Sequence, residues 1–298
     1  MALVDENYPK KAAEEMSDAA LKAAALQNFK QEEVRKYNFP TEIVDLPTKG
    51  LLYTKDNPLA TGKVEMKYMT AREEDILTSA NLIKQGVVLD KLFQSMIVSK
   101  INYDDLLVCD KNAIMIAARI LGYGKEYAVE VQDPFSENKQ KVVIDLTTIE
   151  AKEYDYDSIT NGQNEFTFVL PASKRTITFR LLTHGLEKKI KDDLKGYAKL
   201  TKNTGIDKEL TTRLKNLITS VDGKSDVATI NNFVDNELLA MDSRALRDEI
   251  KKVTPDLDMT FVFTSETTGE TKVMDMPMDV SFFWPNSWVS PVSPFGDI

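Results

Sequence analysis

The sequence is poor in the side chains that most often carry chemistry, with one histidine and one cysteine in 298 residues. His184 alone cannot provide a metal site built from several histidines, and Cys109 alone cannot form an intramolecular disulfide or a cysteine-rich metal site. We therefore predict a protein made in a reducing cytosol, with no metal ligand and no cofactor, whose stability comes from packing.

Long apolar runs and an excess of positive charge are missing as well. No stretch approaches the roughly 20 apolar residues that span a bilayer, and Met1–Glu6 lacks the basic and then apolar order of a secretory signal. We expect neither membrane insertion nor export by that route. The formal net charge is -9 and the isoelectric point is near 4.9. Nucleic acid is therefore not the expected main partner, because nonspecific affinity for phosphates comes largely from Lys and Arg.

What the sequence does contain is ordinary for a soluble protein: 42% of residues are hydrophobic and 29% are charged, which allows at least one core. The hydrophobic pattern switches between helical and strand periods along the chain. This predicts an α+β fold in which helical blocks alternate with small antiparallel β-sheets and hairpins. In chain order we expect a flexible N-terminal arm (1–38), a helical block (70–124), a β block (125–182), a second helical block (183–254), a β-hairpin (256–281) and a Pro/Ser-rich tail (286–298), with 39–285 as a single body.

Local signals locate several elements more closely. Ile43–Tyr53 is predicted to form a strand, a turn and a second strand. Thr70 and Glu73 have the spacing of a capping box, and the apolar residues after them predict one helix that ends at Gly86. Leu214–Val221 is expected to form one helical stripe of the second helical block.

Two segments share one pattern of strand, polar turn and strand: Val129–Ile144 and Phe261–Met274. Each follows a helical block and is predicted to form a β-hairpin. The likeness is compatible with an internal duplication and also with two unrelated hairpins, and the sequence leaves both open.

Three acidic pairs are the strongest candidates for catalysis, since glycosidases and two-metal enzymes need facing carboxylates. The pairs are Glu73–Glu74, Asp104–Asp105 and Asp192–Asp193. Neighbouring residues of a helix do not face each other, and the first two pairs lie where helices are expected to start, so a structural role is favoured. We interpret His184 as a surface or capping residue at a helix start, and Cys109 as a packed residue in an apolar helix.

The last part of the sequence is rich in aromatic residues. Phe282, Phe283, Trp284 and Trp288 lie within seven positions, and Pro285 and later prolines prevent the segment from forming a core of its own. The segment must therefore dock elsewhere, either on this chain or on a neighbouring subunit, where aromatic anchors dominate binding energy. These five residues are the candidate protein-interface residues, and no residue is assigned a catalytic, cofactor-binding or metal-binding role.

Four segments, in this order, resemble one known family. They are Leu46–Tyr53 (LPTKGLLY), Met69–Ala80 (MTAREEDILTSA), the apolar helix around Asp110–Gly124, and Phe282–Pro285 (FFWP). Together they look like the baseplate-hub assembly family of T4-type contractile-tailed bacteriophages. The resemblance implies a non-enzymatic structural protein of the phage tail baseplate, present in the virion and assembled in the host cytoplasm. Its implied partners are other baseplate or hub proteins, with no membrane and no small-molecule substrate.

The sequence departs from that family at two turns. Some similar proteins carry Cys-x-x-Cys pairs where this chain has Asp133–Ser136 and Thr264–Gly269, so a zinc site is not carried over. Two alternatives to a baseplate component stay open. One is a tail-assembly chaperone that is absent from the finished particle. The other is a hydrolase of cell-wall glycan, which would need two carboxylates about 5 to 10 Å apart in a cleft.

Overall fold

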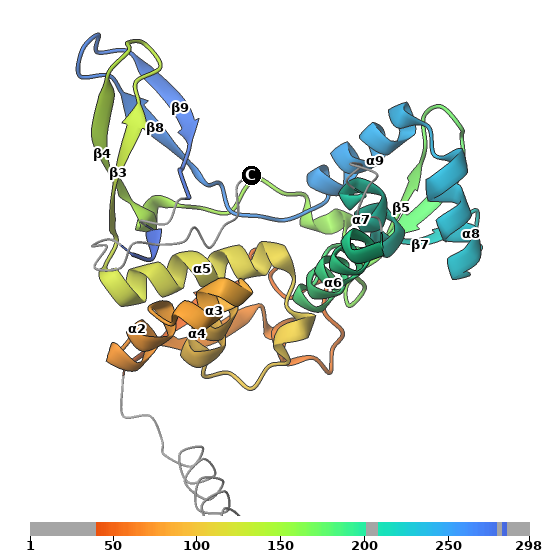
Figure 1. The fold of residues 1–298 in the computed structure, drawn as a ribbon, viewed down its shortest axis with the longest axis horizontal. Helices are drawn as coiled ribbons and strands as arrows, with labels where there is room; N and C mark the ends of the chain where they lie inside the picture. The colour runs from red at the N-terminus through yellow and green to blue at the C-terminus, as the bar shows by residue number, and fades with distance from the viewer. Residues whose placement is uncertain (1–39, 201–207, 279–281, 285–298) are drawn as a thin grey trace, which may run out of the picture. The chain divides into compact units, whose positions relative to one another are not determined.

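The computed structural model describes residues 40–200, 208–278 and 282–284 (Figure 1), and all that follows concerns the compact unit that begins at Pro40. The predicted arm (1–38) and tail (286–298) lie outside the described residues. In the part of the chain that is described, helices alternate with antiparallel sheets of two or three strands, so the predicted α+β fold is confirmed. None of its helices combines the length and the apolar character needed to cross a membrane.

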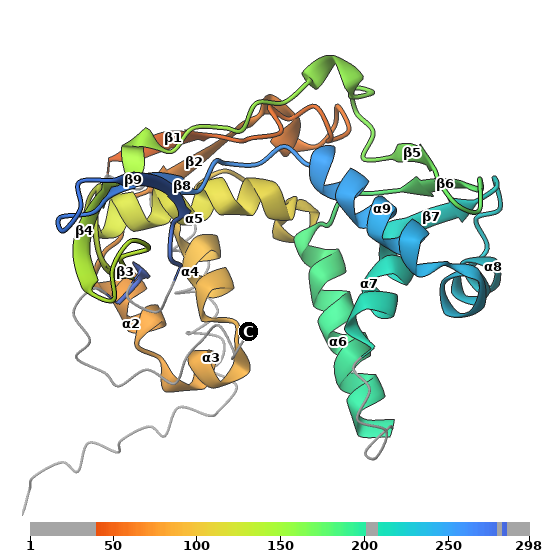
Figure 2. The ribbon, with the colours of Figure 1, turned by 90° about the horizontal axis from the view of Figure 1, so that it is seen from above.

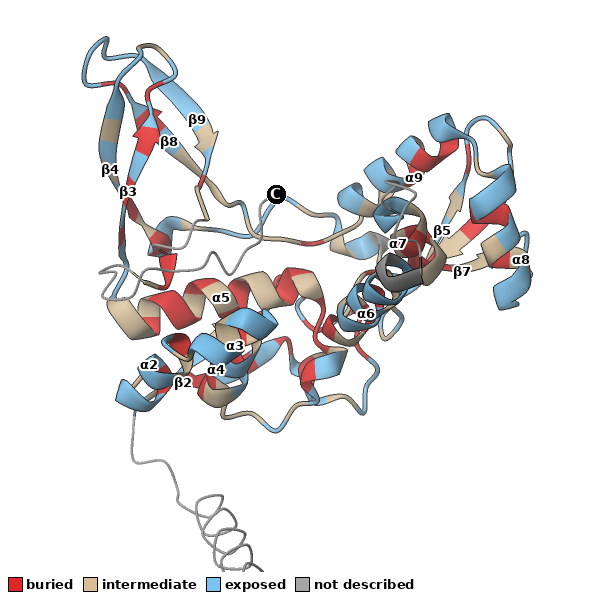
Figure 3. Ribbon diagram, in the orientation of Figure 1, coloured by how far each residue is buried: buried red, intermediate tan, exposed pale blue. Residues whose placement is uncertain are grey.

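The first part of this unit is a small sheet followed by helices. Strand β1 (Thr41–Asp45) pairs with β2 (Lys63–Lys67), and the helices are α2 (Ala71–Leu77), α3 (Ala80–Gln85), α4 (Val88–Met96) and α5 (Val108–Tyr123), with 3-10 turns η1 (Pro58–Thr61) and η2 (Tyr103–Asp105). Helix α5 is the centre of the core, because it buries residues along its whole length (Figure 3). It ends at Tyr123 with Gly124 as its C-cap.

Two predictions for this region are wrong. The segment Leu46–Tyr53 does not return as a second strand, because Lys49 and Gly50 both have positive φ (51° and 79°) and consecutive turns curl the chain. The partner of β1 is β2 instead. The single helix expected to reach Gly86 is two helices, since Ser79 is extended and the Thr78 hydroxyl donates to the Glu74 carbonyl (3.0 Å), which competes with helix continuation.

The two predicted hairpins are confirmed. Strand β3 (Glu126–Gln132) pairs with β4 (Lys139–Asp145), and β8 (Thr260–Thr264) pairs with β9 (Thr271–Asp275). Figures 1 and 2 both show the hairpins side by side, although more than a hundred residues separate them in the sequence. Hydrogen bonds join them near their turns, and each buries one face, with Val129, Val131 and Phe263 among the buried residues.

The remaining elements surround a three-stranded sheet. Strands β5 (Phe166–Val169), β6 (Thr176–Phe179) and β7 (Ile218–Val221) are accompanied by α6 (His184–Leu200), α7 (Glu209–Leu217), α8 (Val227–Asn232), a π-helical turn η5 (Phe233–Glu237) and α9 (Ala240–Lys252), while η3 (Leu146–Thr148) and η4 (Tyr156–Ser158) precede the sheet. Figure 2 shows α6 and α7 lying against each other, which their residue contacts support.

One prediction for this region is also wrong. Ile218 and Val221 were expected on a helical stripe, but α7 ends at Leu217 and these residues form β7, paired with Phe179 and Ile177 of β6. The physical reason is that three of the four residues of Ile218–Val221 are β-branched, and such side chains are restricted in a helix and pack well on a pleated strand.

Candidate functional site

Four carboxylates are buried in the described residues, and each joins segments that are distant in the sequence. They are Glu73, Asp110, Asp133 and Asp242, with exposed fractions of 0%, 0%, 2% and 0%. We call them the carboxylate anchors. Burying a charged group is costly unless hydrogen bonds compensate it, so the partners of each anchor explain why it can be there.

Asp110 on α5 holds the turn that contains the LPTKGLLY motif. Its carboxylate accepts hydrogen bonds from the Thr48 backbone N–H (3.0 Å), the Thr48 hydroxyl (2.8 Å) and the Tyr53 hydroxyl (2.6 Å). The Tyr53 oxygen in turn accepts from the backbone N–H of Leu107 (2.9 Å). Burial raises the pKa of Asp110 to about 6, although the bonds from Tyr53 and Thr48 act in the opposite direction.

Two glycines allow the Leu46–Tyr53 turn to pack closely against the backbone of residues 60–62. A Cβ at Gly50 would lie 2.4 Å from the Ala60 carbonyl oxygen, and one at Gly62 would lie 2.6 Å from the Lys49 carbonyl carbon. Both glycines also have positive φ. The exposed Lys49 is the one charged residue of the motif, and its Nζ lies 3.7 Å from the centre of the Tyr156 ring. The motif is therefore explained by local packing.

Glu73 is the second anchor, and it belongs to the MTAREEDILTSA motif. Its Oε1 accepts from the Lys67 ammonium (2.8 Å) and the Ser95 hydroxyl (2.7 Å), while its Oε2 accepts from the Thr70 N–H (3.0 Å) and hydroxyl (2.6 Å). The predicted capping box is present. Burial raises the pKa of Glu73, but the bonds from Lys67, Thr70 and Ser95 outweigh burial and bring it to about 2. Its sequence neighbour Glu74 is exposed, so this acidic pair does not share one site.

Asp133 joins the two hairpins at their turns. Its carboxylate accepts from the Phe135 N–H (2.8 Å), the Ser136 hydroxyl (2.8 Å) and the Ser265 hydroxyl of the other hairpin (2.7 Å). Beside it, the Gln140 side chain donates to the Thr264 carbonyl and accepts from the Glu266 N–H, both at 2.9 Å. The two turns at which the sequence lacks cysteine pairs thus meet in space. They are joined by one hydrogen bond between side chains and by two bonds from the Gln140 side chain to backbone groups, which do not resemble a zinc-thiolate set.

We predict that this connection does not depend on metal. Ser265→Ala should lower the free energy of unfolding by about 1–2 kcal/mol, because Asp133 loses a donor and the Thr267 and Thr268 amides lose an acceptor. EDTA should leave the melting temperature unchanged. Thr271→Ala, an exposed change in the same hairpin, is the control. A chelator effect as large as that of Ser265→Ala would contradict the prediction.

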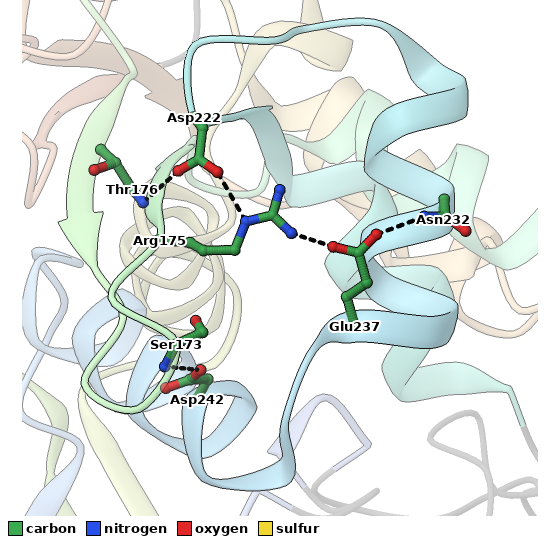
Figure 4. A network of polar contacts seen from close by, with 7 residues as sticks. All are labelled: Ser173, Arg175, Thr176, Asp222, Asn232, Glu237 and Asp242. Atoms are coloured by element: carbon green, nitrogen blue, oxygen red, sulfur yellow. Dashed lines mark hydrogen bonds and ion pairs between the residues drawn. The ribbon is translucent and has the colours of Figure 1, made fainter.

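Asp242 at the start of α9 holds the turn between β5 and β6. Its two oxygens accept from the backbone N–H groups of Ala172 (2.8 Å) and Ser173 (3.0 Å), and Figure 4 shows its contact with Ser173. Beside this turn Arg175 donates to Asp222 (2.8 Å) and pairs with Glu237 of η5. These contacts fix the π-helical turn against the sheet.

An open groove of about 720 Å³ lies between α6, α7, β7 and the start of α8. Its lining includes basic residues (Arg180, Lys189 and Lys215) together with the acidic pair Asp192–Asp193. Both acidic side chains are partly or fully exposed, and Asp192 lies 3.8 Å from Lys195. Neither sign of charge dominates the groove, so it carries no signature of a phosphate or metal ligand.

The two single reactive residues are both in the interior. Cys109 is buried, and burial raises the pKa of its thiol, which agrees with the predicted packing role. His184 does begin α6, as predicted, but the expected surface position is wrong, since only 7% of the residue is exposed. Its ring is covered by Tyr103, whose ring centroid lies 4.6 Å away. Across the described residues, no group of three or more His, Cys, Asp or Glu is arranged to hold a metal ion.

Three of the five predicted interface residues are described. Phe282 and Phe283 are fully buried, against Tyr127 (5.0 Å between ring centroids) and Phe93 (5.9 Å), respectively. The Trp284 indole N–H donates to the Leu77 carbonyl (3.2 Å). Pro285 and Trp288 lie outside the described residues. Phe282 and Phe283 therefore belong to the core of this chain, and a role of the segment in a subunit interface stays a prediction.

The chain is thus an α+β protein in which buried carboxylates hold separate elements together. Residues 44–284 match the protein family described as "T4 bacteriophage base plate protein", so this chain belongs to that family. No curated protein and no solved structure matches the chain. The family assigns the chain to the structural components of the phage baseplate, and with them to the virion tail.

Proposed function

We propose that this chain is a non-enzymatic baseplate component that binds neighbouring baseplate or hub subunits through surfaces of fixed shape. The observation that carries the proposal is the family match, which extends over residues 44–284. Within that range lie all four carboxylate anchors, and each of them holds two or more elements together: turns in the case of Asp110 and Asp242, two hairpins in the case of Asp133, and β2 with α2 and α4 in the case of Glu73. Rigid elements present a binding surface in one geometry, which an assembly with many subunits requires.

Exposed apolar side chains support a binding role. Val262 and Val273 are direct partners in the β8–β9 register, and they are 66% and 64% exposed. Val143 of β4 is 62% exposed, and Met241 at the start of α9 is 64% exposed. Large side chains of this kind gain free energy when a partner covers them. The arm at 1–38 and the tail at 286–298 with Trp288 are the further parts of this proposal, as reaching elements outside the rigid surfaces.

The proposal predicts that the full-length chain is present in purified phage particles at a stoichiometry typical of baseplate proteins. Quantitative mass spectrometry of purified virions measures this directly. A signal in assembly intermediates that disappears from finished particles would instead identify a tail-assembly chaperone. Absence from both would contradict the proposal.

A shortened chain tests the reaching elements. We expect residues 40–285 to enter assembling baseplates about tenfold less than the full chain, because interface energy is concentrated in a few anchors. Circular dichroism first establishes that the shortened protein is folded. Chains 1–285 and 40–298 are the matched controls that separate the two ends. Incorporation of 40–285 at the normal level would contradict this prediction while leaving the family assignment untouched.

A further inference from the structure

The start of α6 is held tightly against η2 and the start of α5, as Figure 2 shows. The His184 N–H donates to the Leu106 carbonyl (2.7 Å), and the Val108 N–H donates to the Leu182 carbonyl (2.9 Å). A Cβ at Gly185 would lie 3.1 Å from the Asp104 carbonyl oxygen. We call this contact the α6 junction. The backbones approach so closely that a group placed here has little room to move.

The His184 ring lies inside the α6 junction with one nitrogen unsatisfied. Its Nδ1 is buried and has no hydrogen-bond partner in the described part of the chain. A carboxylate oxygen, Asp90 Oδ1 of α4, lies 3.8 Å from it, which is beyond hydrogen-bonding distance. A buried polar nitrogen without a hydrogen-bond partner costs free energy. This cost would be relieved if the α6 junction opened and water reached the ring.

Charges from four elements face this ring. Asp90 is already engaged, because its Oδ1 lies 2.7 Å from Lys111 Nζ of α5 and accepts from the Tyr103 hydroxyl of η2 (3.3 Å). Lys111 is also 3.8 Å from Glu187 of α6. Burial lowers the pKa of His184, Lys111 lowers it too, and Asp90, Glu187 and Asp104 of η2 raise it, with burial the largest effect.

We infer that His184 is a pH-dependent switch. The α6 junction stays packed while the imidazole ring is neutral, and it opens more often when the ring is protonated. An imidazolium at this position would be removed from water, and its nearest carboxylate is already paired with Lys111. The proton therefore binds better to a state in which the ring is solvated. The ligand of this site is a proton alone, and the inference does not depend on the role in the baseplate.

The sign of the effect follows from the depressed pKa. The folded state binds a proton more weakly than the open state, so the stabilisation by neutral His184 is present above the ordinary histidine pKa of about 6.5 and is lost as the pH falls below it. At pH 5.5 the opening equilibrium of the junction should rise by up to about tenfold relative to pH 7.5, the limit set by a solvated pKa near 6.5.

Nuclear magnetic resonance can test this without ambiguity, because His184 is the only histidine in the sequence. The imidazole resonances of the full-length chain should titrate with a pKa below 6.5. Asp90→Asn should lower this pKa further, and Lys111→Met should raise it, since each variant removes one of the opposing charges. A wild-type pKa at or above 6.5 would overturn the inference.

Hydrogen exchange tests the movement itself. After correction for intrinsic rates, amides in the first turns of α6 should exchange faster at pH 5.5 than at pH 7.5 in the wild-type chain. His184→Phe keeps an aromatic ring against Tyr103 and cannot be protonated, so this difference should disappear. Amides of the β3–β4 hairpin are the internal control. If the exchange rates of the two chains differ equally between pH 5.5 and pH 7.5, His184 is not the switch. If His184→Phe does not fold, the wild-type imidazole titration remains as the test.

Discussion

Glu73→Gln should lower the free energy of unfolding by about 3 kcal/mol at pH 7. The substitution removes the negative partner of the buried Lys67 ammonium, and breaking one side of a buried ion pair is strongly destabilising. It also weakens the acceptor for the Ser95 hydroxyl and for the Thr70 N–H. Denaturant unfolding of the two chains, with equal slopes, measures the difference.

Two variants show whether the ion pair is the cause. Glu74→Gln, at the exposed neighbour, should change stability by less than about 0.5 kcal/mol. Adding Lys67→Met to Glu73→Gln should recover part of the loss, because the buried charge is then removed together with its partner. If Glu73→Gln and Glu74→Gln behave alike, the anchor has been misassigned.

The same residue predicts a pH dependence. The folded pKa of Glu73 is about 2, below the ordinary value of 4.5. Its contribution to stability is therefore complete above pH 4.5 and is lost as the pH falls toward 2. Glu73→Gln should lose less stability than the wild type across this range, so their unfolding curves should converge at acid pH.

The sequence predicts local structure well where the chemistry of neighbouring residues decides it. The spacing of Thr70 and Glu73 predicts the start of α2, and Gly86 predicts the end of α3. Alternation of apolar and polar residues predicts both hairpins. In these cases the deciding contacts lie within one turn of a helix or across one pair of strands.

What could not be predicted depends on contacts between distant residues. The pairing of β1 with β2 is fixed by turns that no simple period describes. The burial of His184 depends on Tyr103, which lies some eighty positions earlier. The meeting of Asp133 and Ser265 spans 132 positions. The burial of these polar residues could not be predicted, because the partners that compensate it are not their neighbours in the sequence.

One signal for an anchor was present in the sequence without being interpreted. Asp110 lies in the first turn of a very apolar helix, where a carboxylate is favoured by the helix dipole and, if it is buried, needs hydrogen-bond donors that compensate its burial. To predict that Asp110 is a buried acceptor, one would have to know that Thr48 and Tyr53 of the LPTKGLLY segment donate hydrogen bonds to it. Two of the segments that resemble the baseplate family therefore take part in anchor networks, through Thr48 with Tyr53 and through Glu73.

Asp110→Ala should lower the free energy of unfolding by about 3 kcal/mol, because three buried donors lose their acceptor and each costs about 1 kcal/mol or more. The Leu46–Tyr53 turn should loosen first, since Asp110 is what ties Thr48 and Tyr53 to α5. Unfolding by denaturant measures the loss, and hydrogen exchange at the Leu51 and Tyr53 amides locates it.

Asp110→Asn and Tyr53→Phe complete the test. The asparagine variant can still accept hydrogen bonds through one oxygen, so its loss should be smaller, and Tyr53→Phe should cost about 1–2 kcal/mol because the Leu107 N–H loses its acceptor. Since burial raises the folded pKa of Asp110 to about 6, the stability that this residue contributes is greatest below pH 3.8 and declines as the pH rises through 6. The gap between wild type and Asp110→Asn should therefore widen from pH 7 to pH 4. A constant gap would show that the carboxyl titrates normally and that burial does not raise its pKa.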